Sequence, residues 1–412
     1  MNISKGEIMV KRNNNFSKLQ AGYLFPEINR RKKAFMEKNP KAKIISLGIG
    51  NTTEPLPKNI TKCLKKAAAN LGTAKGYTGY GDEQGVAELR KKIAEVFYDN
   101  KVKAEEVFIS DGAKCDIGRL QLMFGANTTI AVQDPSYPVY VDGSVIIGAT
   151  GDYNSSRGQF DGIVYMPCTP KNGFFPDLSI VPRTDLIYFC SPNNPTGAVA
   201  TKDQLKSLIA FAKKNKSIIL FDAAYSEFIK DKNLPKSIFE IDGAKEVAIE
   251  INSFSKPAGF TGVRLGWTVV PESLKYDDGS LVNKDWNRIM TTVFNGASNI
   301  VQYGMLMSME EDGVSEMKEN IAFYMENAKL IKKALNDVKI KTHGGENAPY
   351  IWAEFPEKKS WDVFEEILVK ANIVTTPGSG FGPVGEGYMR FSAFGHRSDV
   401  EEACKRIREK LK

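Results

Sequence analysis

Histidines are scarce in this sequence, and it has no pattern typical of paired cysteines. Its 412 residues include two histidines, too few to supply a zinc site or a Ser-His-Asp triad well. The five cysteines are scattered, odd in number and form no C-x-x-C pair, as expected of reduced thiols in a reducing compartment. We therefore expect no metal site and no disulfide framework.

Long apolar runs and long basic blocks are also absent. No apolar stretch approaches the ~20 residues of a membrane-spanning helix, and the opening MNISKGEIMVKRNNNFSK lacks the apolar centre of a signal peptide. The net charge of +7 is mild, and charges of both signs are interspersed, as in KKIAEVFYDN. We expect a cytosolic protein that binds neither membranes nor nucleic acids, with a charge compatible with anionic small molecules.

Short runs rich in Val, Ile and Phe alternate with amphipathic stretches. The runs are EVFIS (106–110), TTIAVQD (128–134), DLIYFCSP (185–192), SIILFDAAY (217–225) and EVAIEINSF (246–254). Such alternation is typical of βα units that build a mainly parallel sheet. With 42% hydrophobic and 25% charged residues, a chain of this length indicates two or three globular domains.

The sequence indicates where one helix begins and where it ends. Thr201 and Gln204 have the spacing of a capping box, in which each side chain bonds to the other residue's backbone N–H. Apolar residues then recur at helical spacing from Leu205 to Ala212, and the pattern ends near Asn215. The sequence therefore predicts a helix that begins just after Thr201.

The pattern changes after residue 295. Amphipathic helical segments now alternate with short strand-like pieces such as APYIWAEF and GYMRFSAF, which indicates an α+β second domain. Residues 1–45 carry no strand of the large sheet, and we expect them to form an N-terminal arm that joins this second domain. The expected division is a large domain over 46–295 and a smaller one over 296–412.

Ligands of open α/β sheets bind beyond the carboxyl ends of the strands, so the residues that end each run are candidates for a site. They are DGAK (111–114), DPSY (134–137), SPNNPTG (191–197), DAAY (222–225) and SFSK (253–256). In chain order they supply an amide-rich turn, an aromatic ring, an asparagine, a carboxylate with a tyrosine, and a lysine.

This ordered set, followed by GVRLGW, closely resembles the fold type I pyridoxal-phosphate (PLP) aminotransferases of the aspartate aminotransferase superfamily. The resemblance extends from LGIGNTTEP (47–55) to YMRFSAFGHR (388–397). It implies PLP as cofactor, amino acids and 2-oxo acids as substrates, and a homodimer with shared active sites. The fold it implies is α/β, with a mainly parallel mixed sheet flanked by helices in the large domain and a smaller α+β domain.

The resemblance assigns the catalytic groups. PLP needs a lysine amine that bonds to its aldehyde, which implies this role for Lys256. Once freed, Lys256 would shuttle a proton between the substrate's α-carbon and the cofactor. Asp222 would keep the pyridine nitrogen protonated, with a helix N-cap as the alternative role. Tyr225 and Asn194 would hydrogen-bond to the ring hydroxyl, although Asn194 also fits pure turn chemistry.

A phosphate group needs N–H donors and cations, which a glycine turn at the start of a helix supplies. By the same resemblance, Ala113 and Lys114 would contact the phosphate through their backbone. Ser253, Ser255 and Arg264 would add hydroxyl and guanidinium donors.

Further residues are expected around the ring and the substrate. Tyr137 would stack on the ring, with core packing as the alternative. Arg390 would hold the substrate α-carboxylate in a bidentate pair, the alternatives being a surface salt bridge or an interdomain tie. Gly50, Lys114, Tyr137 and Asn194 are also expected to contact the substrate.

Two more segments, AGYLFPEINRRKKAF (21–35) and KGYTGYGDEQGVAELR (75–90), resemble one family of this superfamily, the LL-diaminopimelate aminotransferases. QDPSYPVYVD, FCSPNNPTG and FNGASNIVQ support the same resemblance. Members of that family make LL-diaminopimelate from tetrahydrodipicolinate, with glutamate as amino donor, on a route to lysine and peptidoglycan.

The far end of that substrate carries a second amine and a second carboxylate. The resemblance implies that Tyr23, Tyr80, Glu83 and Asn295 reach the site from the neighbouring subunit. Glu83 would bind the distal ammonium group, while Asn295 and Lys114 would serve carboxylates. Alternatively, Glu83 is a charge that favours the N-terminus of the following helix.

Other functions on the same fold are less well supported. An aminotransferase for aspartate, aromatic or varied substrates shares the cofactor residues and stays open as an alternative. A PLP-binding regulator usually carries a DNA-binding domain, but the N-terminal arm is short and shows no basic recognition helix. A decarboxylase is disfavoured because Arg390 would hold the α-carboxylate.

Overall fold

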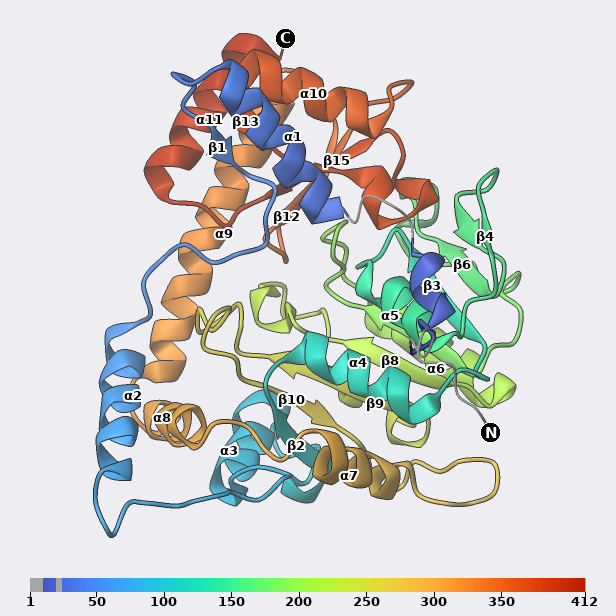
Figure 1. The fold of residues 1–412 in the computed structure, drawn as a ribbon, viewed down its shortest axis with the longest axis vertical. Helices are drawn as coiled ribbons and strands as arrows, with labels where there is room; N and C mark the ends of the chain where they lie inside the picture. The colour runs from blue at the N-terminus through green and yellow to red at the C-terminus, as the bar shows by residue number, and fades with distance from the viewer. Residues whose placement is uncertain (1–9, 20–23, 412) are drawn as a thin grey trace, which may run out of the picture.

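The computed structural model describes residues 10–19 and 24–411. Figure 1 shows a large unit in the lower part of the view and a smaller unit above it. Within the described ranges, no helix is both long enough and apolar enough to cross a membrane.

A seven-stranded sheet forms the centre of the large unit, with strand order β2-β10-β9-β8-β7-β3-β6. The strands are β2 (Val107–Ser110), β3 (Ile130–Asp134), β6 (Ile163–Pro167), β7 (Leu186–Cys190), β8 (Ile218–Asp222), β9 (Ala248–Ser253) and β10 (Gly266–Val269). β10 is antiparallel to both of its neighbours, and the other neighbouring pairs are parallel. The mainly parallel mixed sheet is confirmed; β6 and β10 are additional to the runs recognised in the sequence.

Helices cover both faces of this sheet, which is why β2, β3, β7, β9 and β10 are buried along their whole length. Val107 and Ile109 face one core, and Phe108 between them faces the other. The covering helices are α2 (Lys58–Leu71), α3 (Ala87–Tyr98), α6 (Lys202–Asn215) and α8 (Asn299–Glu310) on the first face, and α4 (Ala113–Phe124), α5 (Val139–Ile147) and α7 (Val282–Val293) on the second.

The smaller unit has a four-stranded sheet with strand order β11-β12-β15-β14. Its strands are β11 (Thr342–Gly344), β12 (Tyr350–Glu354), β14 (Thr376–Pro377) and β15 (Tyr388–Ser392), and its helices are α1 (Leu24–Lys38), α9 (Gly313–Asp337), α10 (Ser360–Ala371) and α11 (Arg397–Lys410). β1 (Ile45–Ser46) pairs in parallel with β13 (Ile373–Val374). The blue N-terminal elements therefore lie among the red C-terminal ones (Figure 1).

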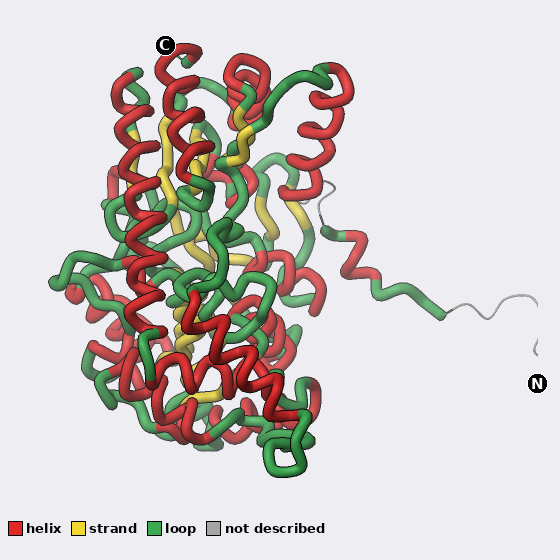
Figure 2. Tube along the Cα trace, turned by 90° about the vertical axis from the view of Figure 1, so that its left-hand side faces the viewer, coloured by secondary structure: helices red, strands yellow, loops and turns green. Residues whose placement is uncertain are grey.

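Short elements complete the chain. β4 (Tyr153–Asn154) and β5 (Gln159–Phe160) pair with each other. The 3-10 helices are η1 (Asn14–Ser17), η2 (Ala104–Glu106), η3 (Pro170–Asn172), η4 (Ser226–Phe228), η5 (Ile238–Glu240), η6 (Ala244–Glu246), η7 (Gly378–Phe381) and η8 (Pro383–Gly385). The described residues 10–19 lie at one side of the molecule in Figure 2. Asn13 and Asn15 each donate to the Ile146 carbonyl of α5 over 3.3 Å.

The change from one core to the other occurs within α9. Val301 and Met317 belong to the core of the large unit, whereas Ile321 belongs to that of the smaller unit. α8 and the N-terminal part of α9 pack against the large unit, and the domain boundary expected at residue 296 stays a prediction.

The capping box at α6 is confirmed. The Thr201 backbone N–H donates to Gln204 Oε1 over 2.8 Å, and the Gln204 backbone N–H donates to Thr201 Oγ1 over 3.2 Å. The helix then runs from Lys202 to Asn215, as the sequence predicts.

Replacing Thr201 with Ala removes one of these bonds and should lower the free energy of unfolding by about 1 kcal/mol. The measurement is the midpoint of urea-induced unfolding. Thr201→Ser is the matched control, since serine keeps the hydroxyl and should leave the midpoint close to that of the parent. Equal losses in both variants would show that the hydroxyl does not stabilise the helix.

Candidate active site

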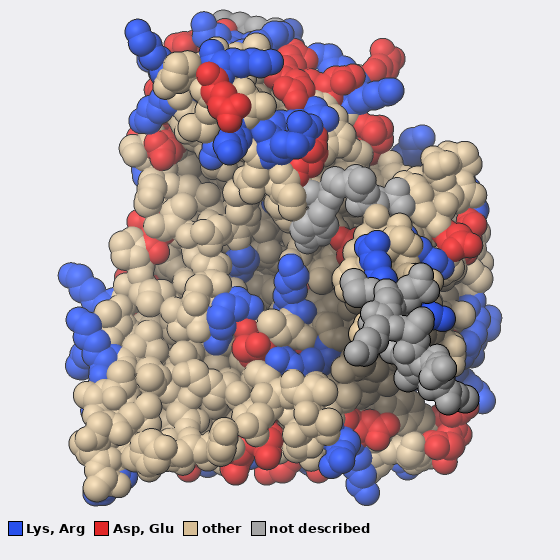
Figure 3. All heavy atoms as spheres, viewed as in Figure 1, with Lys and Arg blue, Asp and Glu red and all other residues tan. Residues whose placement is uncertain are grey.

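A cavity of about 380 Å³ lies where the carboxyl ends of β7, β8 and β9 face the smaller unit. Figure 3 shows a hollow between the two units, with Lys and Arg side chains gathered in it. Twelve of the residues proposed from the sequence line the cavity: Gly50, Ala113, Lys114, Tyr137, Asn194, Asp222, Tyr225, Ser253, Ser255, Lys256, Arg264 and Arg390. Seven segments far apart in the sequence therefore meet at one place.

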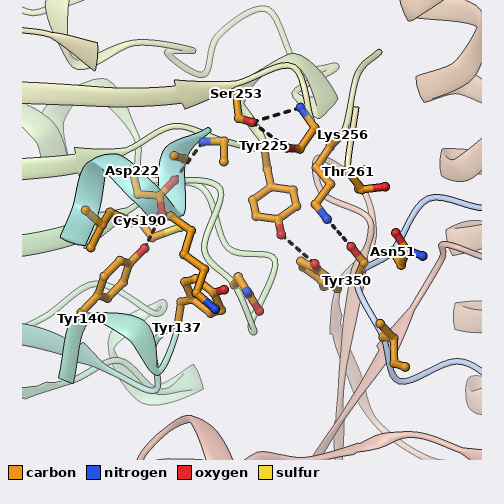
Figure 4. A pocket seen from close by; sticks show the side chains of 18 of the residues that line it. Asn51, Tyr137, Tyr140, Cys190, Asp222, Tyr225, Ser253, Lys256, Thr261 and Tyr350 are labelled. Carbon is orange, nitrogen blue, oxygen red and sulfur yellow. Dashed lines mark hydrogen bonds between the residues drawn. The ribbon is translucent and has the colours of Figure 1, made fainter. Parts of the chain in front are cut away.

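Lys256 follows β9 and points across the cavity (Figure 4). Its Nζ donates to the Gly50 carbonyl oxygen and lies 5.2 Å from the centre of the Phe394 ring. Burial lowers the pKa of the Lys256 amine to about 7, and the positive charges of Arg390 and Arg264 act in the same direction. A substantial fraction of this amine is therefore neutral, and nucleophilic, near neutral pH.

Asp222 is the last residue of β8 and is 6% exposed. Its Oδ2 accepts a hydrogen bond from the Tyr140 hydroxyl over 2.6 Å, and its Oδ1 accepts one from the Ala224 backbone N–H over 3.1 Å. It forms no salt bridge with another described residue. Burial raises the pKa of Asp222, so the site would favour a cationic partner that stabilises the carboxylate.

Tyr225 and Tyr350 form a buried pair of phenols, with their hydroxyl oxygens 2.7 Å apart. Tyr225 follows β8, and Tyr350 begins β12 in the smaller unit. The sequence patterns identified Tyr225 but missed Tyr350 and Tyr140. Tyr140 lies three residues after Tyr137, within the stretch QDPSYPVYVD. This closeness to Tyr137 is the sequence signal that could have pointed to Tyr140.

An anion cradle lies at the start of α4. Gly112 is the N-cap residue, with φ of 125°, and Ala113 and Lys114, the first residues of the helix, line the cavity. The free N–H groups of a helix N-terminus are suited to bind an anion. Beside this turn, Ser255 Oγ accepts hydrogen bonds from Ser253 Oγ over 2.9 Å and from Arg264 Nη1 over 3.2 Å. Helix amides, hydroxyls and a guanidinium therefore surround one end of the cavity, as a phosphate requires.

Arg390 is a buried cation, 1% exposed, on β15. Its Nη1 donates to Asn194 Oδ1 over 2.7 Å, and its Nη2 donates to the Gly48 carbonyl oxygen over 2.5 Å. The guanidinium lies 4.4 Å from the centre of the Tyr350 ring. The bond to Asn194 joins the two units, but no carboxylate among the described residues pairs with Arg390, so a surface salt bridge does not account for its position.

The residues expected to serve a neighbouring subunit do not line the cavity of their own chain. Tyr80 is 88% exposed, and Asn295 is an exposed residue with φ of 69°. Glu83 lies before α3, whose first turn contains Glu88 as its acidic residue. Glu83 therefore precedes the first turn of α3, and its helix-terminus alternative stays open. Tyr23 lies outside the described residues.

The segments that contain these exposed residues contact each other. Asn299 Nδ2 donates to Thr78 Oγ1 over 2.7 Å and to the Gly79 carbonyl oxygen over 2.9 Å. A Cβ atom on Gly296 would lie 3.9 Å from the Cα atom of Glu83. The Tyr80–Glu83 loop and the loop that contains Asn295 thus form one exposed surface.

Comparisons with known proteins agree with this geometry. A family model described as aminotransferase class I and II matches residues 42–407. The chain is 59% identical, over 98% of its length and 87% of the relative's, to the chloroplastic LL-diaminopimelate aminotransferase of Arabidopsis thaliana. It is 54% identical to the LL-diaminopimelate aminotransferase of Protochlamydia amoebophila, over 98% of each chain. The solved structure of L,L-diaminopimelate aminotransferase from Chlamydomonas reinhardtii matches with a TM-score of 0.94 and 61% identity, over 98% of this chain and 99% of that one.

These matches extend over nearly the whole chain, well beyond the cofactor motifs. They confirm the resemblance, the fold and the PLP cofactor expected from the sequence. The chain belongs to the class I and II aminotransferases, which are PLP-dependent enzymes, and within them to the family of the LL-diaminopimelate aminotransferases.

Proposed function

We propose that this protein transfers an amino group between LL-diaminopimelate and 2-oxoglutarate, and in reverse from glutamate to tetrahydrodipicolinate. The observation that carries the proposal is sequence identity. The chain is 54% to 61% identical, over 98% of its length, to enzymes named for this substrate. The matches cover 98% of the chain and so also span the segments beyond the cofactor site. The cytosolic location expected from the sequence stays a prediction, since one of these relatives is chloroplastic.

The residues of the cavity fit PLP at both ends. Asp222 is a buried carboxylate that lacks a cationic partner among the described residues, which suits a protonated ring nitrogen. At the other end, a Cβ atom on Gly112 would lie 2.4 Å from Arg264 Nη2, so only glycine leaves room for the cradle. When bound, PLP supplies an aldehyde that captures amino groups and a ring that accepts the electron pair of the α-carbon.

Three side chains would carry the chemistry. The neutral amine of Lys256 is suited to bond with the aldehyde carbon. Once released, it would take a proton from the substrate's α-carbon and deliver it to the cofactor. Asp222 would hold the proton on the ring nitrogen. Tyr225 would donate to the ring hydroxyl, its own oxygen being already paired with Tyr350.

Arg390 and Asn194 would bind the α-amino-acid end of the substrate, which all amino-acid substrates share. The buried guanidinium makes no ion pair in the described structure, and its planar donors match a carboxylate. Lys114, Tyr137 and Gly50 line the same cavity and would surround the ring and substrate.

We further propose a homodimer in which each subunit completes the site of the other. Tyr80 and Asn295 are exposed in their own chain, Glu83 is half-buried, and none of the three lines its cavity. A second copy would bring these residues, with Tyr23, to the mouth of its partner's site. Glu83 would then bind the distal ammonium group of diaminopimelate, and Asn295 its distal carboxylate.

Lys256→Ala should abolish the visible absorbance of the bound cofactor and lower turnover by about 100-fold or more, because both covalent attachment and proton transfer are lost. Absorbance spectra and a transamination assay measure the two effects. Lys284→Ala, at an exposed position on α7, is the control and should change neither. A yellow, active Lys256→Ala variant would contradict the assignment.

Gly112→Ala should weaken PLP binding by about tenfold or more, because the added methyl group strains a residue with positive φ and displaces Arg264. Titration of the apoprotein with PLP measures the affinity. Gly118→Ala is the matched control on the same helix, since its Cβ atom would meet nothing within 4 Å. If Gly112→Ala binds PLP like the parent, the phosphate does not lie in this cradle.

Substrate preference can be tested with LL-diaminopimelate, its meso isomer, aspartate and aromatic amino acids, each with 2-oxoglutarate as acceptor. We expect the LL isomer to give the highest kcat/KM. A preference for aspartate or aromatic substrates would favour the alternative aminotransferase function.

Glu83→Gln should lower kcat/KM for LL-diaminopimelate by about tenfold and affect glutamate much less, because glutamate has no distal amine. The exposed Glu88→Gln on α3 is the matched control and should leave both values unchanged. Unchanged turnover of both substrates in Glu83→Gln would remove Glu83 from the site.

A further inference from the structure

The Asp222 carboxylate is held by two neutral hydrogen-bond donors, and the Tyr140 hydroxyl makes the shorter bond. The distance from Tyr140 Oη to Asp222 Oδ2 is 2.6 Å, against 3.1 Å from the Ala224 backbone N–H to Oδ1 (Figure 4). Within the described part of the chain, each carboxylate oxygen thus has one hydrogen-bond donor. This arrangement fixes the plane of the carboxylate at the wall of the cavity.

Tyr140 itself is firmly held. It is the second residue of α5, and it is 1% exposed. Its ring stacks on that of Tyr188 with centres 5.1 Å apart and planes inclined by 19°, and it meets the Tyr137 ring edge-on at 5.9 Å. Burial and the nearby charge of Asp222 raise the pKa of Tyr140, so its hydroxyl stays protonated and acts as the donor.

A neutral donor has a specific advantage at this position. It stabilises the ionised carboxylate and orients it, but it leaves the negative charge available for another cation. A lysine or arginine in the place of Tyr140 would pair with Asp222 and cancel that charge. Without a donor at position 140, the buried carboxylate would keep only the hydrogen bond from the Ala224 backbone N–H among the described residues, and its ionised form would be costly.

We propose that Tyr140 is a positioning residue that keeps Asp222 oriented and ionised toward the ring nitrogen of PLP. This inference rests on the proposed role of Asp222. Tyr140 acts through the carboxylate, so its contribution should be seen in cofactor binding and in kcat, and not in the KM of the amino-acid substrate.

Tyr140→Phe tests this directly, because it removes the hydroxyl and keeps the stacked ring. We expect PLP to bind the apoprotein about 10-fold to 100-fold more weakly, which corresponds to the loss of one hydrogen bond to a charged group. kcat should fall, and the KM for the amino donor should stay within about twofold of the parent.

Tyr188→Phe is the matched control. It removes the same atom from the neighbouring ring of the stack, and the Tyr188 hydroxyl makes no hydrogen bond to Asp222. We expect its PLP affinity to equal that of the parent. Equal weakening in both variants would mean that packing, and not the hydroxyl of Tyr140, supports the site. Parental affinity in Tyr140→Phe would also overturn the proposal.

A double variant separates this inference from the proposed function. If the hydroxyl acts through the carboxylate, Tyr140→Phe should change the PLP affinity of Asp222→Asn by less than about twofold. Fully additive losses would overturn the inference. Parental PLP affinity in Asp222→Asn itself would overturn both the role of Asp222 and the inference, whereas weak binding by Asp222→Asn with parental binding by Tyr140→Phe would overturn only the role of Tyr140.

Discussion

The site depends on two opposite charges that are buried in one cavity and do not pair with each other. Asp222 and Arg390 are both almost fully buried, and their hydrogen-bond partners among the described residues are all neutral groups. Leaving a charge buried without a counterion costs several kcal/mol, so a protein keeps such groups only where a ligand or a packed network stabilises them. The cavity is therefore preorganised for a ligand with a cation at one position and an anion at another.

The fold explains how both charges can be buried without meeting. Asp222 lies at the end of a central strand in the large sheet, and Arg390 lies on a strand of the smaller unit. Tyr225 and Tyr350, one from each unit, lie along the same cavity and are bonded to each other. Hydroxyl pairs of this kind let the two units close on each other without bringing the carboxylate and the guanidinium into a salt bridge, which would remove both from the chemistry.

The cofactor end of the site could be predicted from the sequence because its residues follow strands that the sequence also marks. Lys256, Asp222 and Asn194 each end or follow a run of apolar residues, and in a parallel sheet those ends share one edge. The contacts across the fold could not be predicted in this way. Tyr140 lies 82 residues from Asp222, and Tyr225 lies 125 residues from Tyr350, and no local pattern specifies either pair.

Strand β10 and the division between the units also depend on contacts across the fold and not on local sequence patterns. β10 is short and runs against its neighbours, so its position depends on pairing with β2 and β9 rather than on its own residues. The division of the cores within α9 likewise depends on which sheet each turn of a continuous helix contacts. Local periodicity predicts a helix equally well on either side of such a change.

The residues proposed to bind the shared end of the two substrates are buried, whereas those proposed for the differing end are more accessible. Diaminopimelate and glutamate share an α-amino-acid end, and the groups proposed for that end, Arg390 and Asn194, are buried and rigidly bonded to each other. The substrates differ at the far end, for which Glu83 and Asn295 are proposed. Asn295 is exposed and Glu83 is half-buried, and neither lines the cavity of its own chain. A rigid pocket that fitted one distal end closely would exclude the other, because a buried acidic group without an ammonium partner is destabilising. Discrimination between two alternating substrates is therefore better placed where water can replace the missing partner, at the edge of the cavity and on the surface that a second subunit would supply.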